Sequence, residues 1–159
     1  MKKLFAIMIL VSCLMTSMQT VASDGDTYIS VDARAACVKY GEEYGICPEL
    51  LMAMIEMESS GNPKAKNGDC TGLLQISERW HKDRMERLGV TDLYDVNGNV
   101  RVAADYLVEL AEEYGDLPVV LMKYNGDSRA EWHYETGFVS EYAARIMDRS
   151  EELERIHGK

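Results

Sequence analysis

Residues 48–59, PELLMAMIEMES, form the segment that decides the fold. Pro48 suits the first turn of a helix, and the apolar residues behind it recur at helical spacing. This helix carries two glutamates. The positions three, four and seven residues before Glu58 are all apolar (Ile55, Met54 and Leu51), whereas those before Glu56 form a mixed face. The spacing therefore predicts that the carboxyl group of Glu58 lies on the apolar side of the helix.

Such a position has a chemical consequence for Glu58. Burial disfavours an ionised carboxyl group, and the C-terminal end of a helix dipole disfavours it further. Both effects predict a raised pKa. A carboxylic acid that stays protonated near neutral pH can protonate a glycosidic oxygen. The structural alternative is a glutamate at a frayed helix end that points into solvent.

Outward from this segment, helical spacing continues and no stretch alternates long enough to predict a strand. The class is all-α, with about six helices in a single domain over residues 23–159. The predicted helices cover residues 32–44, 48–58, 77–89, 100–114, 116–125 and 139–156, with a short additional helix at 73–76. Asp32 is the expected N-cap of the first helix, and Asn97 or Asn99 precedes the fourth. Residues 59–71 are expected to form an irregular loop.

The N-terminus has the layout of a secretory signal peptide. Two lysines precede an apolar run over residues 4–15, and small and polar residues follow, which predicts a signal peptide at 1–22 with cleavage after Ala22. The run is shorter than the roughly 20 residues that span a bilayer. Residues 10–13, LVSC, also resemble a lipobox, in which Cys13 would carry a lipid. We expect a secreted, extracytoplasmic protein, with a lipoprotein as the alternative.

The chain is acidic, with a formal net charge of −10. Cleavage after Ala22 leaves 15 basic and 27 acidic residues, a net charge of −12. This acidity argues against nucleic acid as a partner. The three histidines, His81, His133 and His157, lack metal-ligand spacing, so we expect neither a metal nor an organic cofactor.

Three cysteines, Cys37, Cys47 and Cys70, would remain after export. An oxidising compartment favours one disulfide and leaves one thiol over. Cys47 with Cys70 is the preferred pair, because that bridge would tie the start of the second helix to the loop behind it. The spacing fits neither a zinc site nor a CxxC redox pair.

Several motifs follow Glu58 in order along the chain. They are Glu58-Ser59, Pro63 with Ala65, Gly72-Leu73-Leu74-Gln75-Ile76, the segment NGNVRVAADYL at 97–107, Lys123-Tyr124-Asn125-Gly126, and Tyr142-Ala143. Together they resemble the signature of the soluble lytic transglycosylase (SLT) family over about residues 33–150. Departures from the family pattern occur at Leu74, Lys123, Gly126-Asp127 and Phe138.

The resemblance implies a lysozyme-like all-α fold and a monomer that acts on peptidoglycan glycan strands. The family cleaves the β-1,4 bond between N-acetylmuramic acid and N-acetylglucosamine and leaves 1,6-anhydro ends. Glu58 would serve first as general acid and then as base, so one carboxylate suffices where hydrolysis ordinarily uses two. A hydrolytic muramidase is the alternative, with Asp69, Asp83 and Asp127 as loose candidates for a second carboxylate. A non-catalytic module for wall binding or assembly is a further alternative.

The resemblance also implies substrate-binding residues, and each has a structural alternative. The candidates are Ser59, Gln75, Tyr124, Asn125 and Tyr142. Ser59 could instead cap its own helix, and Gln75 could brace the backbone. Asn125 could be a plain helix C-cap, and Tyr142 could simply pack in the core.

Overall fold

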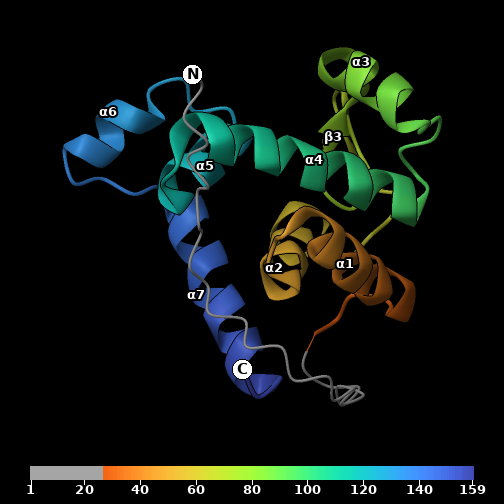
Figure 1. Ribbon diagram of the computed structural model, residues 1–159, viewed down its shortest axis with the longest axis horizontal. Coiled ribbons are helices and arrows are strands. Elements are labelled where there is room, and N and C mark those ends of the chain that lie inside the picture. The colour runs from red at the N-terminus through yellow and green to blue at the C-terminus, as the bar shows by residue number, and fades with distance from the viewer. Residues whose placement is uncertain (1–26) are drawn as a thin grey trace, which may run out of the picture.

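The computed structural model describes residues 27–159, which form seven helices and one small sheet (Figure 1). The predicted signal peptide and Cys13 lie outside the described residues. The helices are α1 (Val31–Tyr44), α2 (Pro48–Ser59), α3 (Glu78–Leu88), α4 (Val96–Tyr114), α5 (Leu117–Tyr124), α6 (Ala130–Glu135) and α7 (Glu141–Ile156). The strands are β1 (Lys66–Asn67), β2 (Cys70–Thr71) and β3 (Ile76–Ser77). The predicted all-α class is confirmed, since each strand is only two residues long.

The helix α2 lies at the centre of the core. Its residues Leu51, Met54 and Ile55 are fully buried, and it packs against α1 on one side and α7 on the other. The helix α4 packs on α1 and on α5 (Figure 1). This arrangement brings the C-terminal end of α2, where Glu58 lies, to the beginning of α7.

The beginnings of two helices differ from those predicted. Ser30 caps α1, because its hydroxyl accepts a hydrogen bond from the amide of Ala33 at 3.2 Å, so the expected cap Asp32 lies within the first turn. Asp95 caps α4, because its carboxylate accepts from the amide of Gly98 at 2.7 Å. Asn99 therefore lies in the first turn of α4 rather than before it.

The short helix predicted at 73–76 is wrong. The chain turns at residues 72–75, and Ile76 then begins β3, which pairs antiparallel with β2 in a sheet of order β1-β2-β3. Gly72 and Gln75 have φ values of +82° and +46°, which a right-handed helix does not contain. The amide of Leu74 donates to the side chain of Asn99 at 2.8 Å instead of to a helical carbonyl.

Asn99 holds this turn in place from α4. Its side chain is buried, and its Nδ2 donates to the carbonyls of Thr71 and Leu93, each at 2.9 Å. A Cβ on Gly72 would lie 2.3 Å from Nδ2 of Asn99 and 2.3 Å from the carbonyl oxygen of Leu93. Only glycine therefore fits at this position of the GLLQ segment, both for its φ angle and for its contact with Asn99.

The predicted bridge between Cys47 and Cys70 is not formed. All three described cysteines are free thiols, and Cys47 donates a hydrogen bond to Oε2 of Glu49 at 3.0 Å. Cys47 precedes the first residue of α2, whereas Cys70 lies near Glu58 at the far end. A helix of 12 residues is about 18 Å long, which is well beyond the reach of a disulfide.

The helix α6 was not predicted from the sequence. Only Ala130 of its six residues is buried, so the segment has no apolar period to detect. Within residues 27–159, no helix combines the length and the hydropathy that a membrane span needs.

Candidate active site

The two glutamates of α2 have different surroundings. Glu56 is 8% exposed and forms a two-pronged ion pair with Arg149 of α7, with its Oε2 2.7 Å from Nε and its Oε1 3.1 Å from Nη2. Glu58 has no ion pair within the described part of the chain. Its Oε1 accepts a short hydrogen bond from the hydroxyl of Tyr142, the second residue of α7. The charge of Glu56 is thus neutralised, whereas that of Glu58 is not.

Burial raises the pKa of Glu58, and the hydrogen bond from Tyr142 opposes this rise without cancelling it. Burial and the nearby charge of Glu58 also raise the pKa of the phenols of Tyr142 and Tyr124. Both phenols therefore remain protonated hydrogen-bond donors near neutral pH. The site can hold a neutral carboxylic acid beside neutral phenols.

A cleft of about 800 Å³ adjoins Glu58. Its walls come from the segment 70–77 and from α3, α4 and α5. The lining residues are Cys70, Gln75, Ile76, Ser77, Trp80, His81, Asp83, Arg84, Arg87, Tyr106, Glu109, Lys123, Tyr124, Asn125 and Gly126. Glu58 itself is not part of this lining, but its charge acts on two lining residues, Cys70 and Tyr124. Glu58 therefore lies at the edge of the cleft.

Three of the predicted binding residues line this cleft. Gln75 does so while its Nε2 donates to the carbonyl of Gly72 at 2.9 Å, so its amide also braces the turn. Tyr124 donates its hydroxyl to the carbonyl of Leu74 at 2.7 Å and thereby ties α5 to the same turn. Asn125 is exposed, and its backbone amide ends α5 by donating to Leu121 at 3.1 Å.

The two other predicted residues lie outside the cleft lining. The hydroxyl of Ser59 donates to the carbonyl of Ile55 in its own helix at 3.2 Å, which is the local role considered as its alternative. Tyr142 packs partly against the core, yet its hydroxyl reaches Glu58. The structure therefore joins Tyr142 directly to Glu58 and leaves Ser59 oriented by its own helix.

Aromatic rings form a further part of the cleft. Rings of His81, Tyr106 and Tyr124 form a row, with centroids 4.5 Å and then 5.5 Å apart. Ser77, Trp80, His81 and Arg84 all lie on one wall. Trp80, His81 and Arg84 all belong to the helix predicted at 77–89, and this was the signal that could have brought them together.

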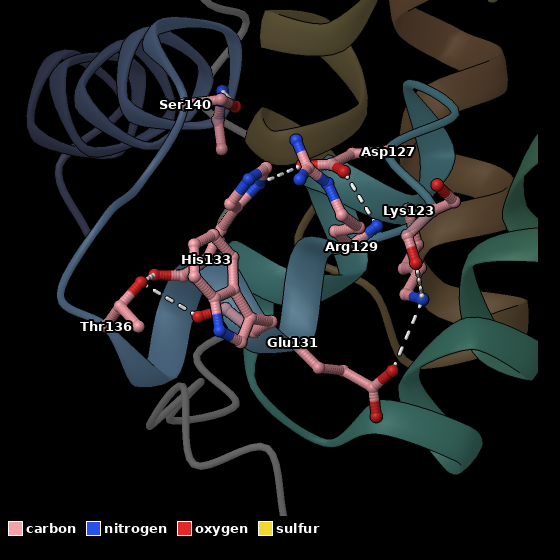
Figure 2. A network of polar contacts seen from close by, with 10 residues as sticks. Lys123, Asp127, Arg129, Glu131, His133, Thr136 and Ser140 are labelled. Atoms are coloured by element: carbon pink, nitrogen blue, oxygen red, sulfur yellow. Dashed lines mark hydrogen bonds and ion pairs between the residues drawn. The ribbon is translucent and has the colours of Figure 1, made fainter.

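Lys123 and Asp127, two of the departures from the family pattern, belong to a polar network between α5 and α7 (Figure 2). Nζ of Lys123 lies 3.3 Å from the carboxylate of Glu131. Asp127 accepts from the amide of Arg129 at 2.8 Å and lies 2.7 Å from Nδ1 of His133. The ring of Phe138 packs edge-on against that of His133, at 5.2 Å between centroids. These contacts tie together residues 123–138, which lead to Tyr142. They also occupy the carboxylate of Asp127.

No group of three or more His, Cys, Asp or Glu side chains within residues 27–159 has the arrangement of a metal site.

Three comparisons with known proteins agree with one another. Residues 36–141 match the family model described as the transglycosylase SLT domain. A transglycosylase of Enterobacteria phage PRD1 is 33% identical over 107 residues, which cover 66% of this chain and 38% of the phage protein. The chain thus spans well under half of that relative's length.

The fold is also similar to that of a solved structure. An inactive mutant of the lytic transglycosylase Slt from Pseudomonas aeruginosa superposes with a TM-score of 0.57, at 20% identity, over 77% of this chain and 22% of that one. The matched family segment contains Glu58, Gln75, Tyr124 and Asn125, and Tyr142 follows directly after it. The chain belongs to the SLT transglycosylase domain family.

Proposed function

We propose that this protein is a peptidoglycan lytic transglycosylase in which Glu58 is the catalytic acid and base. The observation that carries the proposal is the state of Glu58: a carboxyl group of raised pKa at the edge of a cleft, bonded to Tyr142 and lacking a cation. The family membership supports the reaction class, and the 33% identical phage protein is named a transglycosylase.

In this mechanism, protonated Glu58 donates its proton to the oxygen of the β-1,4 bond between N-acetylmuramic acid and N-acetylglucosamine. The bond from that oxygen to C1 of the muramyl sugar breaks, and the N-acetylglucosamine hydroxyl leaves. The Glu58 carboxylate then takes the proton of the muramyl C6 hydroxyl, and the oxygen of that hydroxyl bonds to C1. The products are a 1,6-anhydro end and a regenerated carboxylic acid, so no water is consumed.

Tyr142 would keep one carboxyl oxygen of Glu58 occupied, which leaves Oε2 to carry the moving proton. As the first proton leaves, the phenol bonds to a carboxylate rather than to an acid, and this bond becomes stronger. Gln75, Tyr124 and Asn125 would contact the sugars from the cleft wall. Ser59 would act indirectly, through the end of α2.

The positions of the aspartates favour a lyase over a hydrolytic muramidase. Asp127 is bound to Arg129 and His133, and Asp69 lies exposed in the turn between β1 and β2. Asp83 lines the cleft on α3. None of the three is among the causes that shift the pKa of Glu58, which are burial and the hydrogen bond from Tyr142. Since the substrate lies outside the cytoplasmic membrane, the proposal agrees with export through residues 1–22.

The test is a digest of purified peptidoglycan with the mature protein, with the muropeptide ends identified by mass spectrometry. We expect anhydro ends from the parent protein and none from Glu58→Gln. Hydrated ends would establish a muramidase instead. Binding without release of fragments would leave a non-catalytic wall-binding module, and full activity of Glu58→Gln would remove Glu58 from its role.

A further inference from the structure

The helix α3 forms one wall of the cleft but buries little of its own surface. Of its 11 residues, only Arg84 and Met85 are buried. The helix packs chiefly on α4 and β3 at the outer edge of the molecule (Figure 1). It also bends at His81, whose φ of −114° and ψ of 15° lie outside the helical range. Apolar burial therefore contributes little to the position of this wall.

Charged contacts with α4 hold the wall instead. The carboxylate of Asp105 accepts one hydrogen bond from Nε of Arg84 at 3.2 Å and two from Arg87 at 3.1 Å and 2.7 Å. Nη2 of Arg84 donates to Glu109, one turn further along α4, at 2.5 Å. We call these four residues the arginine clasp. Bonds between guanidinium and carboxylate groups fix direction as well as distance, so the clasp sets how α3 lies on α4.

The arginine clasp has a buried half and an exposed half. The side chains of Arg84 and Asp105 are 8% and 14% exposed, whereas those of Arg87 and Glu109 are 58% and 59% exposed. The guanidinium group of Arg84 also lies over the ring of Tyr106, 4.9 Å from its centroid. Dissolved salt screens charges in solvent far more than buried ones. The exposed half should therefore weaken as the ionic strength rises.

The arginine clasp acts on the cleft although Asp105 does not reach it. Arg84, Arg87 and Glu109 line the cleft, whereas Asp105 is not part of the lining. The remaining lining comes from other elements, and Glu58 lies on α2. A movement of α3 would therefore change the width of the cleft without moving the proposed catalytic acid.

We propose that Asp105 is a positioning residue for glycan binding. Through Arg84 and Arg87 it holds the part of α3 beyond the bend at His81 against α4, and this part forms the cleft wall only while it is held. The inference rests on the proposed function for the identity of the substrate. Because Glu58 is on another helix, loss of the clasp weakens binding of the strand and leaves the chemical step unchanged.

Steady-state kinetics on soluble, uncross-linked glycan strands test the inference. In Asp105→Asn we expect KM to rise about tenfold, because bonds to two guanidinium groups are weakened, while kcat stays within about twofold. Arg87→Met removes only the exposed half of the clasp, so KM should rise about twofold to fivefold. The double variant should match Asp105→Asn alone, since both changes release the same wall. Additive effects would show that Arg87 binds the strand directly and would overturn the inference.

Two further measurements separate a released wall from a general loss of stability. Raising the ionic strength should increase KM more in the parent protein than in Asp105→Asn, where the clasp is already lost. Hydrogen exchange in Asp105→Asn should quicken at the amides of residues 82–88 and stay unchanged in α2. Equal quickening in α2 would show a general loss of stability and would overturn the inference.

Glu43→Gln is the matched control. Glu43 belongs to α1, forms a partly exposed ion pair with Arg101 of α4 at 3.5 Å, and lies outside the cleft lining. The change removes the same charge as Asp105→Asn, so KM, its salt dependence and the exchange of residues 82–88 should equal those of the parent. A rise in KM equal to that of Asp105→Asn would overturn the inference.

The outcomes for this inference and for the proposed function are distinct. Release of hydrated ends with the expected pattern of KM would contradict the proposed lyase and leave the role of Asp105 supported. If the parent protein releases no fragments, the proposed function fails, and calorimetric affinity for the same strands decides the inference in place of KM.

Discussion

The hydroxyl of Tyr142 donates a hydrogen bond to Oε1 of Glu58, although the two residues lie 84 positions apart in sequence. The contact depends on the packing of α7 against α2. It lowers the pKa of a carboxyl group that burial alone would raise further. Tyr142 therefore both tunes and orients the proposed catalytic acid.

Replacing this phenol should change the pH profile in a defined direction. In Tyr142→Phe the opposing hydrogen bond is lost, so the pKa of Glu58 rises and its protonated form persists to higher pH. We expect the alkaline limb of kcat/KM to move to higher pH, while kcat falls about tenfold to a hundredfold through lost orientation. Tyr134→Phe on α6 is the matched control, and its profile should equal that of the parent. An alkaline limb that moves to lower pH would contradict the assigned contact.

Removal of Arg149 should destabilise the fold rather than alter the chemistry. Arg149→Met leaves the buried carboxylate of Glu56 without its two-pronged partner, and loss of one member of such a pair costs about 3–5 kcal/mol. Urea denaturation measures this change. The double variant Glu56→Gln, Arg149→Met should recover much of the loss, because it removes the unpaired charge. A double variant as unstable as Arg149→Met alone would show that the cost is not electrostatic.

Gly72 should tolerate substitution far less than another glycine of similar backbone angle. Gly72→Ala places a Cβ 2.3 Å from both Asn99 and the Leu93 carbonyl, so the turn must move. We expect a loss of more than about 2 kcal/mol and a weaker glycan affinity. Gly68 has a φ of +58° and open space where a Cβ would lie. Gly68→Ala should therefore lower the free energy of unfolding by only about 1 kcal/mol. Equal losses in the two variants would show that backbone strain, not the contact with Asn99, decides the result.

The stability of the protein should fall at low pH through Glu49. Burial would raise the pKa of this carboxylate, but hydrogen bonds from Lys159, Cys47 and His157 outweigh it and lower the pKa to about 2. Because the folded-state pKa lies below the ordinary 4.5, the contribution is complete above pH 4.5 and is lost as the pH falls toward 2. Unfolding free energy measured across this window should fall by about 3 kcal/mol more in the parent than in Glu49→Gln. Parallel curves for the two proteins would remove Glu49 as the cause.

The sequence predicts well what local spacing determines. The apolar period of residues 48–59 correctly placed α2 in the core, and the spacing around Glu58 anticipated its raised pKa. Local spacing failed where contacts with distant segments determine which side chains are buried. It ranked Glu56 as the less buried glutamate, yet Glu56 is covered and paired by Arg149 from 93 residues away. The apolar Val38 is likewise 43% exposed, whereas α1 buries Ala33, Ala36, Cys37 and Tyr40.

Two other errors have the same origin. The pattern at 73–76 is compatible with a helix, but the amide of Leu74 donates to the side chain of Asn99 instead of to a helical carbonyl. The sequence spacing of Cys47 and Cys70 allowed a disulfide, but the length of α2 holds the two residues apart. The ordered motifs of the family identified Glu58, Gln75, Tyr124, Asn125 and Tyr142 as candidates. They did not reveal the row of rings formed by His81, Tyr106 and Tyr124, which comes together only when α3, α4 and α5 are packed.

The link between Asn99 and the turn has a consequence for motion. The amide of Leu74 belongs to no helix or strand, yet it donates to a buried side chain in the first turn of α4. Its exchange with deuterium should therefore follow the opening of α4 rather than the rapid fluctuations of a surface loop. The floor of the cleft would then keep its shape while glycan strands enter and leave, because it moves only when the core itself opens.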